Sequence, residues 1–345
     1  MNQRIYLNED WLFSEQFQNN ILGPEYPEET LQPVRIPHTC KETPFHYFDE
    51  SIYQMVSGYR RHLQIPEEWQ GKRILVTFEG AAHDSTVFCN GKKVGEHHCG
   101  YTAFTVDLTD NVLYGQDNLL CVRLDSREDL NVPPFGYVID YMTYGGIYRD
   151  VYLEVKEQTS LQDVFVSTKL TPEAAQVTSE ITFYGTAKDL QVRQYYALKD
   201  NIAAAGTSSD SSDIMQDSGW QLFCGQTVPA DTGAGAAISL HGIIPHPSLW
   251  DTEHPHLYLL KTQLWQGETL LDESEITFGI REAMFKKDGF YLNGKKLRIR
   301  GLNRHQSYPY VGYAMPKSMQ RLDADLLKKE LGLNAVRTSH YPQSH

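Results

Sequence analysis

The segment Leu297-Arg-Ile-Arg-Gly-Leu-Asn-Arg-His305 is followed by a helical pattern and then by Asn334-Ala-Val-Arg-Thr-Ser-His-Tyr-Pro342. This order predicts a strand, a helix and a second strand. Each predicted strand ends in an arginine and a histidine, with His305 after the first and His340 after the second. Consecutive strands of a parallel β/α unit have their carboxyl ends on one side, and that side holds the active site in β/α barrels. We therefore expect these side chains to converge on one site.

The residues between the two strands predict the helix. Met319, Leu322 and Leu326 fall at positions i, i+3 and i+7, so they share one helical face. Ser318 is the expected N-cap, and Gly332 suits the position just beyond the helix end. The pattern is therefore typical of one complete β/α/β unit.

Residues 1–157 read as an all-β domain. The run at 73–80 alternates and ends on Gly80, and the apolar run at 119–124 is a further predicted strand. Asn90-Gly91 stands between two such runs, and this dipeptide is the strongest short signal for a hairpin turn. A β-sandwich of the jelly-roll type is the natural architecture.

Residues 158–280 predict a second β-sandwich. Seven short strands in this length suit an immunoglobulin-like domain, although a single cysteine, Cys224, leaves no inter-sheet disulfide. The small, polar stretch 203–213 is expected to be a loop between strands. The predicted strands are 162–169, 177–184, 191–199, 220–226, 237–243, 257–265 and 270–278.

Residues 281–345 are expected to be the incomplete start of a (β/α)8 barrel. They begin with a hairpin turn at Asn293-Gly294, and a full barrel needs about 250 residues. Two strands and a helix cannot close a barrel, so we expect this segment to pack on a preceding domain or on a second copy. The predicted fold is thus mostly β: a jelly roll, an immunoglobulin-like sandwich, then the first strands and helix of a barrel.

Charge and cysteine usage narrow the function. The net charge of −13 disfavours nucleic acid and anionic membranes as partners and favours a neutral substrate. The five cysteines are odd in number and form no Cys-x-x-Cys pair, which indicates free thiols in a reducing compartment. The first residues lack the apolar core of a signal peptide, and no run of about 18 apolar residues occurs. We expect a soluble, cytoplasmic protein.

An ordered set of motifs along nearly the whole chain resembles glycoside hydrolase family 2, of the β-galactosidase type. Each motif is weak alone, whereas their order is highly specific. They are Ile36-Pro-His-Thr39, Gly58-Tyr-Arg-Arg61, Asn90-Gly-Lys-Lys-Val-Gly95, Gly145-Gly-Ile-Tyr-Arg-Asp-Val151, Leu249-Trp-Asp-Thr-Glu-His-Pro-His-Leu-Tyr258, Phe278-Gly-Ile-Arg281, Gly301-Leu-Asn-Arg-His305 and Asn334-Ala-Val-Arg-Thr-Ser-His-Tyr-Pro342.

The resemblance implies a sugar-binding jelly roll, an immunoglobulin-like sandwich and a catalytic barrel. It also implies an exo-acting enzyme that cleaves β-glycosides with retention, using one glutamate as acid/base and another as nucleophile. The resemblance places both glutamates on later barrel strands, so we expect them beyond His345 and expect no catalytic residue in this chain. The carboxylates between 297 and 345 are Asp323, Asp325 and Glu330, all on the predicted helix. The chain alone should therefore be inactive.

Four residues are implied as sugar-binding. His305 and His340 resemble two family histidines that contact the sugar and its transition state, and Arg337 resembles an arginine beside the nucleophile. Asp140 matches by spacing an aspartate that reaches the sugar 6-hydroxyl and a monovalent cation. The plainer alternative is that each of these side chains merely caps a loop or forms a local ion pair.

Cofactors and partners follow from the same resemblance. No cofactor is required in this chain, although the complete enzyme could hold Na+ or Mg2+, with Asp140 as a candidate ligand. The segment Gln54-Met-Val-Ser57 departs from the family, so one sugar contact cannot be carried over. The expected partner is a β-galactoside or related neutral glycoside, and we also expect a homo-oligomer.

The sequence is also compatible with two other functions. A β-glucuronidase or β-mannosidase of the same family is the first, although Asp140 would repel a sugar carboxylate. A non-catalytic carbohydrate-binding module is the second. Outside the site, we interpret Arg149 and Asp150 as a structural ion pair, and His97 and His98 as loop residues without a metal.

Overall fold

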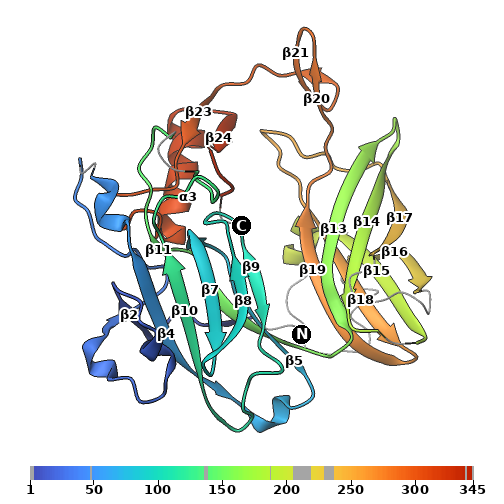
Figure 1. Cartoon of the computed structure of the whole chain (residues 1–345). Helices are drawn as coiled ribbons and strands as arrows, with labels where there is room; N and C mark the ends of the chain where they lie inside the picture. Colours follow the sequence, from blue (N-terminus) through green and yellow to red (C-terminus); the bar gives the residue numbers. More distant parts are fainter. Residues whose placement is uncertain are drawn as a thin grey trace. The chain divides into compact units, whose positions relative to one another are not determined.

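The computed structural model describes residues 4–46, 49–135, 139–186, 188–204, 219–228, 237–338 and 340–343. Its contacts divide the chain into two compact units (Figure 1). The first unit combines residues 3–155 with residues 300–345, and the second unit holds residues 156–299. The fold is mostly β, as the sequence predicts, and no described helix is long and apolar enough to cross a membrane.

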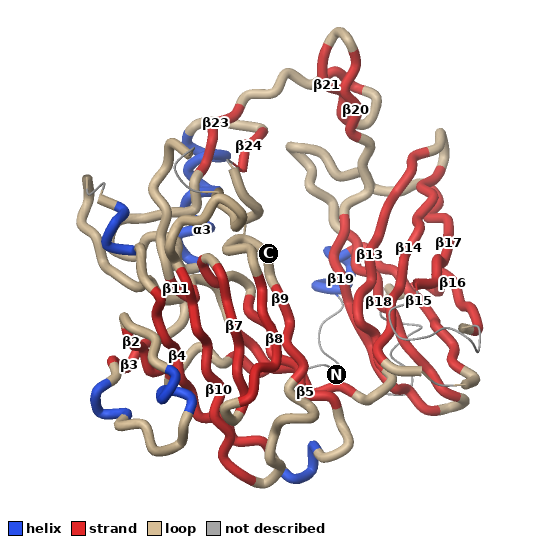
Figure 2. The backbone as a smooth tube through the Cα atoms, viewed as in Figure 1, coloured by secondary structure: helices blue, strands red, loops and turns tan. Residues whose placement is uncertain are grey.

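The jelly roll of the first unit is built from two antiparallel sheets (Figure 2). A separate two-stranded sheet pairs β6 (Ala81–Ala82) with β11 (Gly146–Ile147). One sheet has the order β1 (Ile5–Tyr6), β12 (Val151–Lys156), β5 (Arg73–Phe78) and β9 (Phe104–Asp107). The other has the order β3 (Gln32–Val34), β2 (Trp11–Ser14), β4 (Val56–Ile65), β10 (Gln116–Asp125), β7 (Asp84–Cys89) and β8 (Lys92–His97).

Alternation along the strands explains the jelly-roll core. In β7 every second residue is buried, so one side of the strand faces the interior. The core contains fully buried residues such as Trp11, Tyr59 and Phe78. The predicted hairpin joins β7 to β8, with φ values of 50° at Asn90 and 78° at Gly91, as a type I′ turn requires.

Residues 300–343 form the barrel start. Strands β23 (Gly301–Arg304) and β24 (Ala335–Thr338) pair in parallel, and the helix α3 (Lys317–Asp325) lies between them in sequence (Figure 1). The expected N-cap, Ser318, is wrong: the N-cap is Pro316, two residues earlier, whose fixed φ of −68° and extended ψ of 155° let the helix begin at Lys317. A five-residue π-helical turn, Leu326–Glu330, extends α3 toward Gly332, whose φ is 61°.

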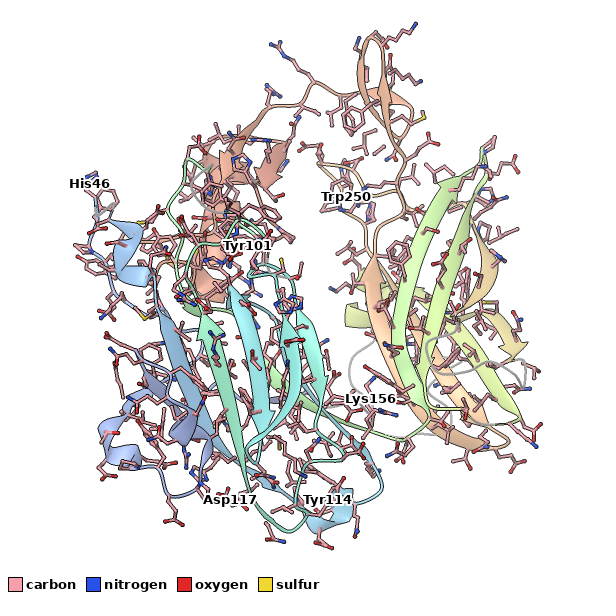
Figure 3. All side chains as sticks on the ribbon, viewed as in Figure 1. His46, Tyr101, Tyr114, Asp117, Lys156 and Trp250 are labelled. Atoms are coloured by element: carbon pink, nitrogen blue, oxygen red, sulfur yellow. The ribbon has the colours of Figure 1, made fainter. Side chains whose placement is uncertain are left out.

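The barrel start packs on the jelly roll through a shared cluster of aromatic residues. Tyr313 and Tyr341 from the barrel start are buried together with Tyr101 and Tyr148 from the jelly roll. Tyr101 is labelled in Figure 3. The expectation that this segment packs on another domain is therefore confirmed for residues 300–343.

The second unit is a sandwich of a three-stranded and a four-stranded antiparallel sheet, as expected for an immunoglobulin-like domain. The helix α1 (Lys199–Ala204) replaces the start of the predicted loop 203–213, and residues 205–213 lie outside the described residues. The sheets are β13 (Ser160–Leu170), β14 (Ala174–Tyr184) and β17 (Ala237–Pro245), and β16 (Gln221–Thr227), β15 (Leu190–Leu198), β18 (Tyr258–Gln266) and β19 (Thr269–Phe278). A separate sheet comprises β20 (Ala283–Lys286), β21 (Gly289–Leu292) and β22 (Lys295–Lys296).

Candidate active site

The carboxyl ends of β23 and β24 carry the residues that the sequence singles out. The parallel register pairs Asn303 with Arg337 and Arg304 with Thr338, so both strands end at the same level. His305 follows β23 directly, and His340 comes two residues after the end of β24. The predicted strand, helix and strand thus bring both histidines to one side of the short sheet.

The two histidines converge with a loop of the jelly roll. The ring centroids of His305 and His340 are 5.8 Å apart, at an interplanar angle of 70°. The ring of Tyr141 lies 4.8 Å from His305 and 5.6 Å from His340. The structure therefore joins residues 141, 305 and 340, which are far apart in the sequence, into one aromatic group.

Asp140 precedes Tyr141 and acts on this group through its charge. Its side chain is exposed. Burial lowers the pKa of His305, and the neighbouring His340 lowers it further, whereas the charge of Asp140 raises it. The net direction is downward, so His305 is held in its neutral form over a wider pH range than a free histidine.

Arg337 takes a different position from the histidines. Its side chain is exposed on β24, and its Nη1 donates to Oδ1 of Asn303 on the neighbouring strand, at 3.4 Å. Within the described residues, no hydrogen bond or ion pair joins Arg337 to Asp140, His305 or His340. The structure thus brings three of the four predicted residues together and leaves Arg337 beside the group, on the exposed side of the strand.

Tyr341 connects the two strand ends and was not singled out from the sequence. Its hydroxyl oxygen accepts a hydrogen bond from the backbone N–H of Gln306, at 3.0 Å, and lies 3.3 Å from Nδ1 of His305. Its ring stacks on Tyr101 at 4.5 Å and 5°. The signal that could have found it is its place directly after His340 in the sequence.

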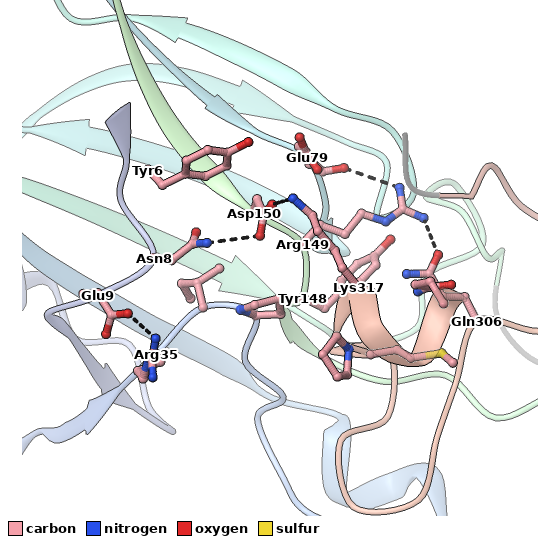
Figure 4. A pocket seen from close by; sticks show the side chains of 15 residues that line it. Tyr6, Asn8, Glu9, Arg35, Glu79, Tyr148, Arg149, Asp150, Gln306 and Lys317 are labelled. Atoms are coloured by element: carbon pink, nitrogen blue, oxygen red, sulfur yellow. Dashed lines mark hydrogen bonds and ion pairs between the residues drawn. The ribbon is translucent and has the colours of Figure 1, made fainter. Parts of the chain in front are cut away.

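Arg149 and Asp150 are both buried, but they do not form the expected ion pair with each other (Figure 4). The guanidinium of Arg149 is instead taken up by carbonyl and amide oxygens. Asp150 accepts from Asn8 and pairs with Lys317 at the start of α3. The predicted ion pair between Arg149 and Asp150 is therefore wrong, and each side chain has other partners.

The guanidinium of Arg149 joins the jelly roll to both strand-end loops. It donates to the carbonyl oxygens of Tyr101, at 2.9 Å, and Pro342, at 2.7 Å. It also donates to Oε1 of Gln306, at 3.2 Å (Figure 4). One arginine thus fixes the loop after β23 and the loop after β24 against the same support.

A cavity of about 400 Å³ lies next to this arginine and is drawn in Figure 4. It mixes charges of both signs, and neither His305 nor His340 lines it. Its polar lining includes Asn8, Arg35, Arg149, Asp150, Gln306 and Lys317. The cavity is therefore separate from the histidine group.

The described residues do not fit a complete metal site around Asp140. No group of three or more histidine, cysteine, aspartate or glutamate side chains among them could hold a metal ion. Asp140 would thus supply one ligand only. His97 is a further correction: it ends strand β8, where its ring stacks on Phe104, because it continues the pairing with β7.

Comparison with known proteins identifies the class. Three family profiles match in order: the sugar binding domain of glycosyl hydrolases family 2 at residues 33–157, glycosyl hydrolases family 2 at 159–281, and the TIM barrel domain of that family at 284–345. The chain belongs to glycosyl hydrolases family 2, as the motif order predicts.

Individual relatives agree. The chain is 39% identical over 343 residues to a β-galactosidase of Thermoanaerobacter pseudethanolicus, covering 99% of this chain and 44% of that protein. It is 38% identical over 351 residues to a β-galactosidase of Thermoanaerobacterium thermosulfurigenes, covering 100% of this chain and 46% of that protein. A crystal structure of Bacteroides uniformis β-glucuronidase matches with a TM-score of 0.84 at 28% identity, over 100% of this chain and 40% of that one. The chain thus spans less than half the length of these relatives.

Proposed function

We propose that this chain is the amino-terminal portion of a retaining, exo-acting β-glycoside hydrolase whose substrate is a β-galactoside. The observation that carries the proposal is the convergence of His305, His340 and the Asp140–Tyr141 loop at the carboxyl ends of β23 and β24. Likeness to two β-galactosidases over nearly the whole chain supports the choice of sugar. Two imidazole groups and one carboxylate can hydrogen-bond the hydroxyl groups of an uncharged sugar.

Each site residue receives a role in this proposal. His305 and His340 hydrogen-bond the sugar hydroxyls, and these bonds strengthen in the transition state. Asp140 accepts a hydrogen bond from the 6-hydroxyl. Arg337 keeps the nucleophilic carboxylate ionised, and its exposed position on β24 leaves its guanidinium available for that partner. No step is assigned to a metal ion.

The chain alone is proposed to be inactive. Retaining hydrolysis needs two carboxyl groups about 5 Å apart. In the described part of the barrel start, all carboxylates lie on α3 and its π-helical extension, and Asp323 is bound to Arg304 at 2.7 Å. The purified chain should therefore release no product from a chromogenic β-galactoside. Turnover comparable to that of complete family members would refute this part of the proposal.

Sugar binding tests the site without requiring turnover. Ligand-detected NMR would compare galactose, mannose and glucuronate against the purified chain, its Asp140→Asn variant and its Asp110→Asn variant. Asp110 is an exposed carboxylate of the jelly roll with no place in the site, which makes it a matched control. Galactose binding that Asp140→Asn weakens and Asp110→Asn preserves would support the proposal.

A β-glucuronidase is the second candidate, because the chain also resembles Bacteroides uniformis β-glucuronidase in structure. Two histidines and Arg337 could serve a sugar carboxylate, whereas the charge of Asp140 would repel it. Glucuronate binding that increases in Asp140→Asn would favour this candidate. A non-catalytic carbohydrate-binding module would instead be indicated by sugar binding without any Asn-Glu strand end encoded beyond His345.

Location and assembly complete the proposal. We propose the cytoplasm, because all five cysteines are unpaired and three of them are buried. We also propose a homo-oligomer. Exposed apolar residues on the barrel start, such as Leu302 and Val336, would be covered by assembly.

A further inference from the structure

The hydroxyl group of Tyr341 lies between the two strand-end loops of the barrel start. Its oxygen is 3.0 Å from the backbone nitrogen of Gln306 and 3.3 Å from Nδ1 of His305. The contact with Gln306 is buried and the contact with His305 is partly buried, while Tyr341 itself is 5% exposed. The hydrogen-bond partners of this hydroxyl are therefore protein groups, and their protons can be assigned one by one.

We infer that Tyr341 is a positioning residue that fixes the neutral tautomer of His305, with the imidazole proton on Nε2. The geometry assigns Nδ1 as the acceptor of the Tyr341 hydroxyl proton. The inference deepens the proposed function, because it states which atom of His305 would meet the sugar. Its geometric premise, however, involves no ligand.

The proton count decides between the two tautomers. The backbone N–H of Gln306 can only donate, so the Tyr341 oxygen accepts there. The Tyr341 hydroxyl proton then needs an acceptor, and within the described residues Nδ1 of His305 is the remaining partner. If Nδ1 carried a proton instead, two donors would point at one oxygen and the hydroxyl proton would be left buried without an acceptor. Such unpaired buried groups are disfavoured, which selects the Nε2–H tautomer.

The jelly roll holds the Tyr341 ring in the orientation that this bond requires. Tyr101 stacks on it at 4.5 Å, with the two rings within 5° of parallel. The hydroxyl of Tyr101 in turn lies 3.2 Å from that of Tyr313. The tyrosine that fixes the tautomer of a barrel histidine is thus held by an aromatic residue of the jelly roll.

The imidazole of His305 is also restrained on its other sides. The ring of Tyr141 lies 4.8 Å away, and His340 lies edge-on at 5.8 Å. Among the described residues, Nε2 of His305 takes part in no hydrogen bond. This leaves Nε2–H as a donor that is oriented and unused.

The consequence for the proposed site is specific. With the proton on Nε2, His305 donates a hydrogen bond to a sugar hydroxyl oxygen and cannot act as a base at that atom. Among the residues that the structure describes, no hydrogen bond joins His340 to a tyrosine hydroxyl, and its side chain is exposed. The two histidines therefore differ: Tyr341 determines the tautomer of one and leaves the other free to adopt either.

The test is two-bond ¹H–¹⁵N correlation NMR on the ¹⁵N-histidine-labelled chain, which distinguishes Nδ1–H from Nε2–H directly. The chain has 13 histidines, and the signals that disappear in His305→Gln assign His305. Tyr341→Phe removes the hydroxyl and retains the ring that stacks on Tyr101. Tyr313→Phe is the matched control, because its hydroxyl is equally buried and contacts Tyr101 and the Met142 carbonyl but not His305.

We expect a dominant Nε2–H tautomer for His305 in the wild-type chain and in Tyr313→Phe, and loss of that dominance in Tyr341→Phe. A dominant Nδ1–H tautomer in the wild-type chain would overturn the inference, even if Tyr341→Phe failed to fold. An unchanged tautomer in a folded Tyr341→Phe variant would also overturn it. Titration with galactose tests the proposed function separately from the tautomer. If galactose leaves the His305 signals unchanged, the proposed function is contradicted. The tautomer is decided by the spectra of the sugar-free chain alone.

Discussion

The strand-end loops of the barrel start and its two strands differ in how much of their apolar surface is buried. The loops after β23 and β24 each bury a tyrosine against the jelly roll: Tyr313 is 2% exposed and Tyr341 is 5% exposed. The strands themselves leave apolar side chains open, since Leu302 is 51% exposed and Val336 is 43% exposed. Site-bearing loops are thus positioned by the jelly roll, independently of any contact that would cover the strands.

The difference also appears in the polar contacts. On the loop side, the guanidinium of Arg149 donates to four groups, two in the jelly roll and two in the strand-end loops, and Lys317 pairs with Asp150. On the strand side, the polar contact of Arg337 stays within the two-stranded sheet. The jelly roll therefore serves as the scaffold of the two strand-end loops.

The largest expected effect comes from removing Arg149. Arg149→Met keeps an apolar stem but leaves the carbonyls of Tyr101 and Pro342 without a buried donor, which should cost roughly 3 kcal/mol of unfolding free energy. Hydrogen exchange should rise in residues 304–306 and 340–343 and stay unchanged in the pairing of β4 with β10. Chemical denaturation with peptide-resolved exchange measures both.

Two further variants sharpen this comparison. Arg149→Lys retains the charge but offers no planar fork, so an intermediate loss is expected. Arg193→Met removes a half-buried arginine that stacks on Trp265 in the other unit, and it should leave the strand-end loops protected. Equal exchange in Arg149→Met and Arg193→Met would show that Arg149 does not hold the loops.

The second effect is a pH dependence beneath the aromatic cluster. His83 is buried next to Tyr101, and burial lowers its pKa to about 4. The unfolded chain binds the proton near 6.5, so stability is complete above that pH and falls as the pH drops from about 6.5 to about 4. The shift corresponds to about 3 kcal/mol for this single group. Denaturant titrations at several pH values measure the slope.

His83→Gln checks the assignment of that slope. The variant removes the titrating group, so the stability should decline less steeply between pH 6.5 and 4. His38 retains its share, because burial also lowers its pKa to about 4. An identical slope in the variant and the wild-type chain would mean that His83 does not contribute.

The sequence predicted the architecture better than the contacts of the site. Periodicity and turn chemistry specify β7, β8 and the Asn90-Gly91 turn locally, since alternation and positive φ are properties of neighbouring residues. The convergence of His305 and His340 followed from the rule for parallel strands. The role of Tyr341 could not be predicted, because its partners Tyr101 and His305 come from distant segments and only packing brings them together.

The third expected effect compares two glycines of the barrel start. Gly312 lies in the loop that packs on the jelly roll. Its φ is 53°, and a β-carbon there would be 2.4 Å from the ring of Tyr144. Gly332 lies at the open end of the helix, with φ of 61° and nothing within 4 Å. Gly332→Ala should cost about 1 kcal/mol for the left-handed backbone, and Gly312→Ala about 2–3 kcal/mol because a steric clash is added.

Thermal or denaturant unfolding of both variants provides the measurement. The backbone term is shared, so the difference between the two variants isolates contact with the jelly roll. Equal losses would indicate that Tyr144 moves aside without cost and that the loop side is less tightly packed than its burial suggests.

The smallest expected effect on stability lies on the open strands. Val336→Thr on β24 replaces a methyl group that already meets solvent, so the unfolding free energy should change by less than about 0.5 kcal/mol. Val76→Thr, at a fully buried position of β5, is the matched control and should cost about 1–3 kcal/mol because its hydroxyl enters an apolar core.

Self-association gives the same variant a second, larger readout. A two-stranded sheet with open edges and exposed apolar residues is a template for pairing with another chain. Light scattering of the wild-type chain should therefore show association that increases with concentration and that decreases in Val336→Thr combined with Leu302→Thr. If the wild-type chain and the double variant are both monomeric at all concentrations, the exposed strands do not drive assembly, and the contrast between the two sides is one of burial alone.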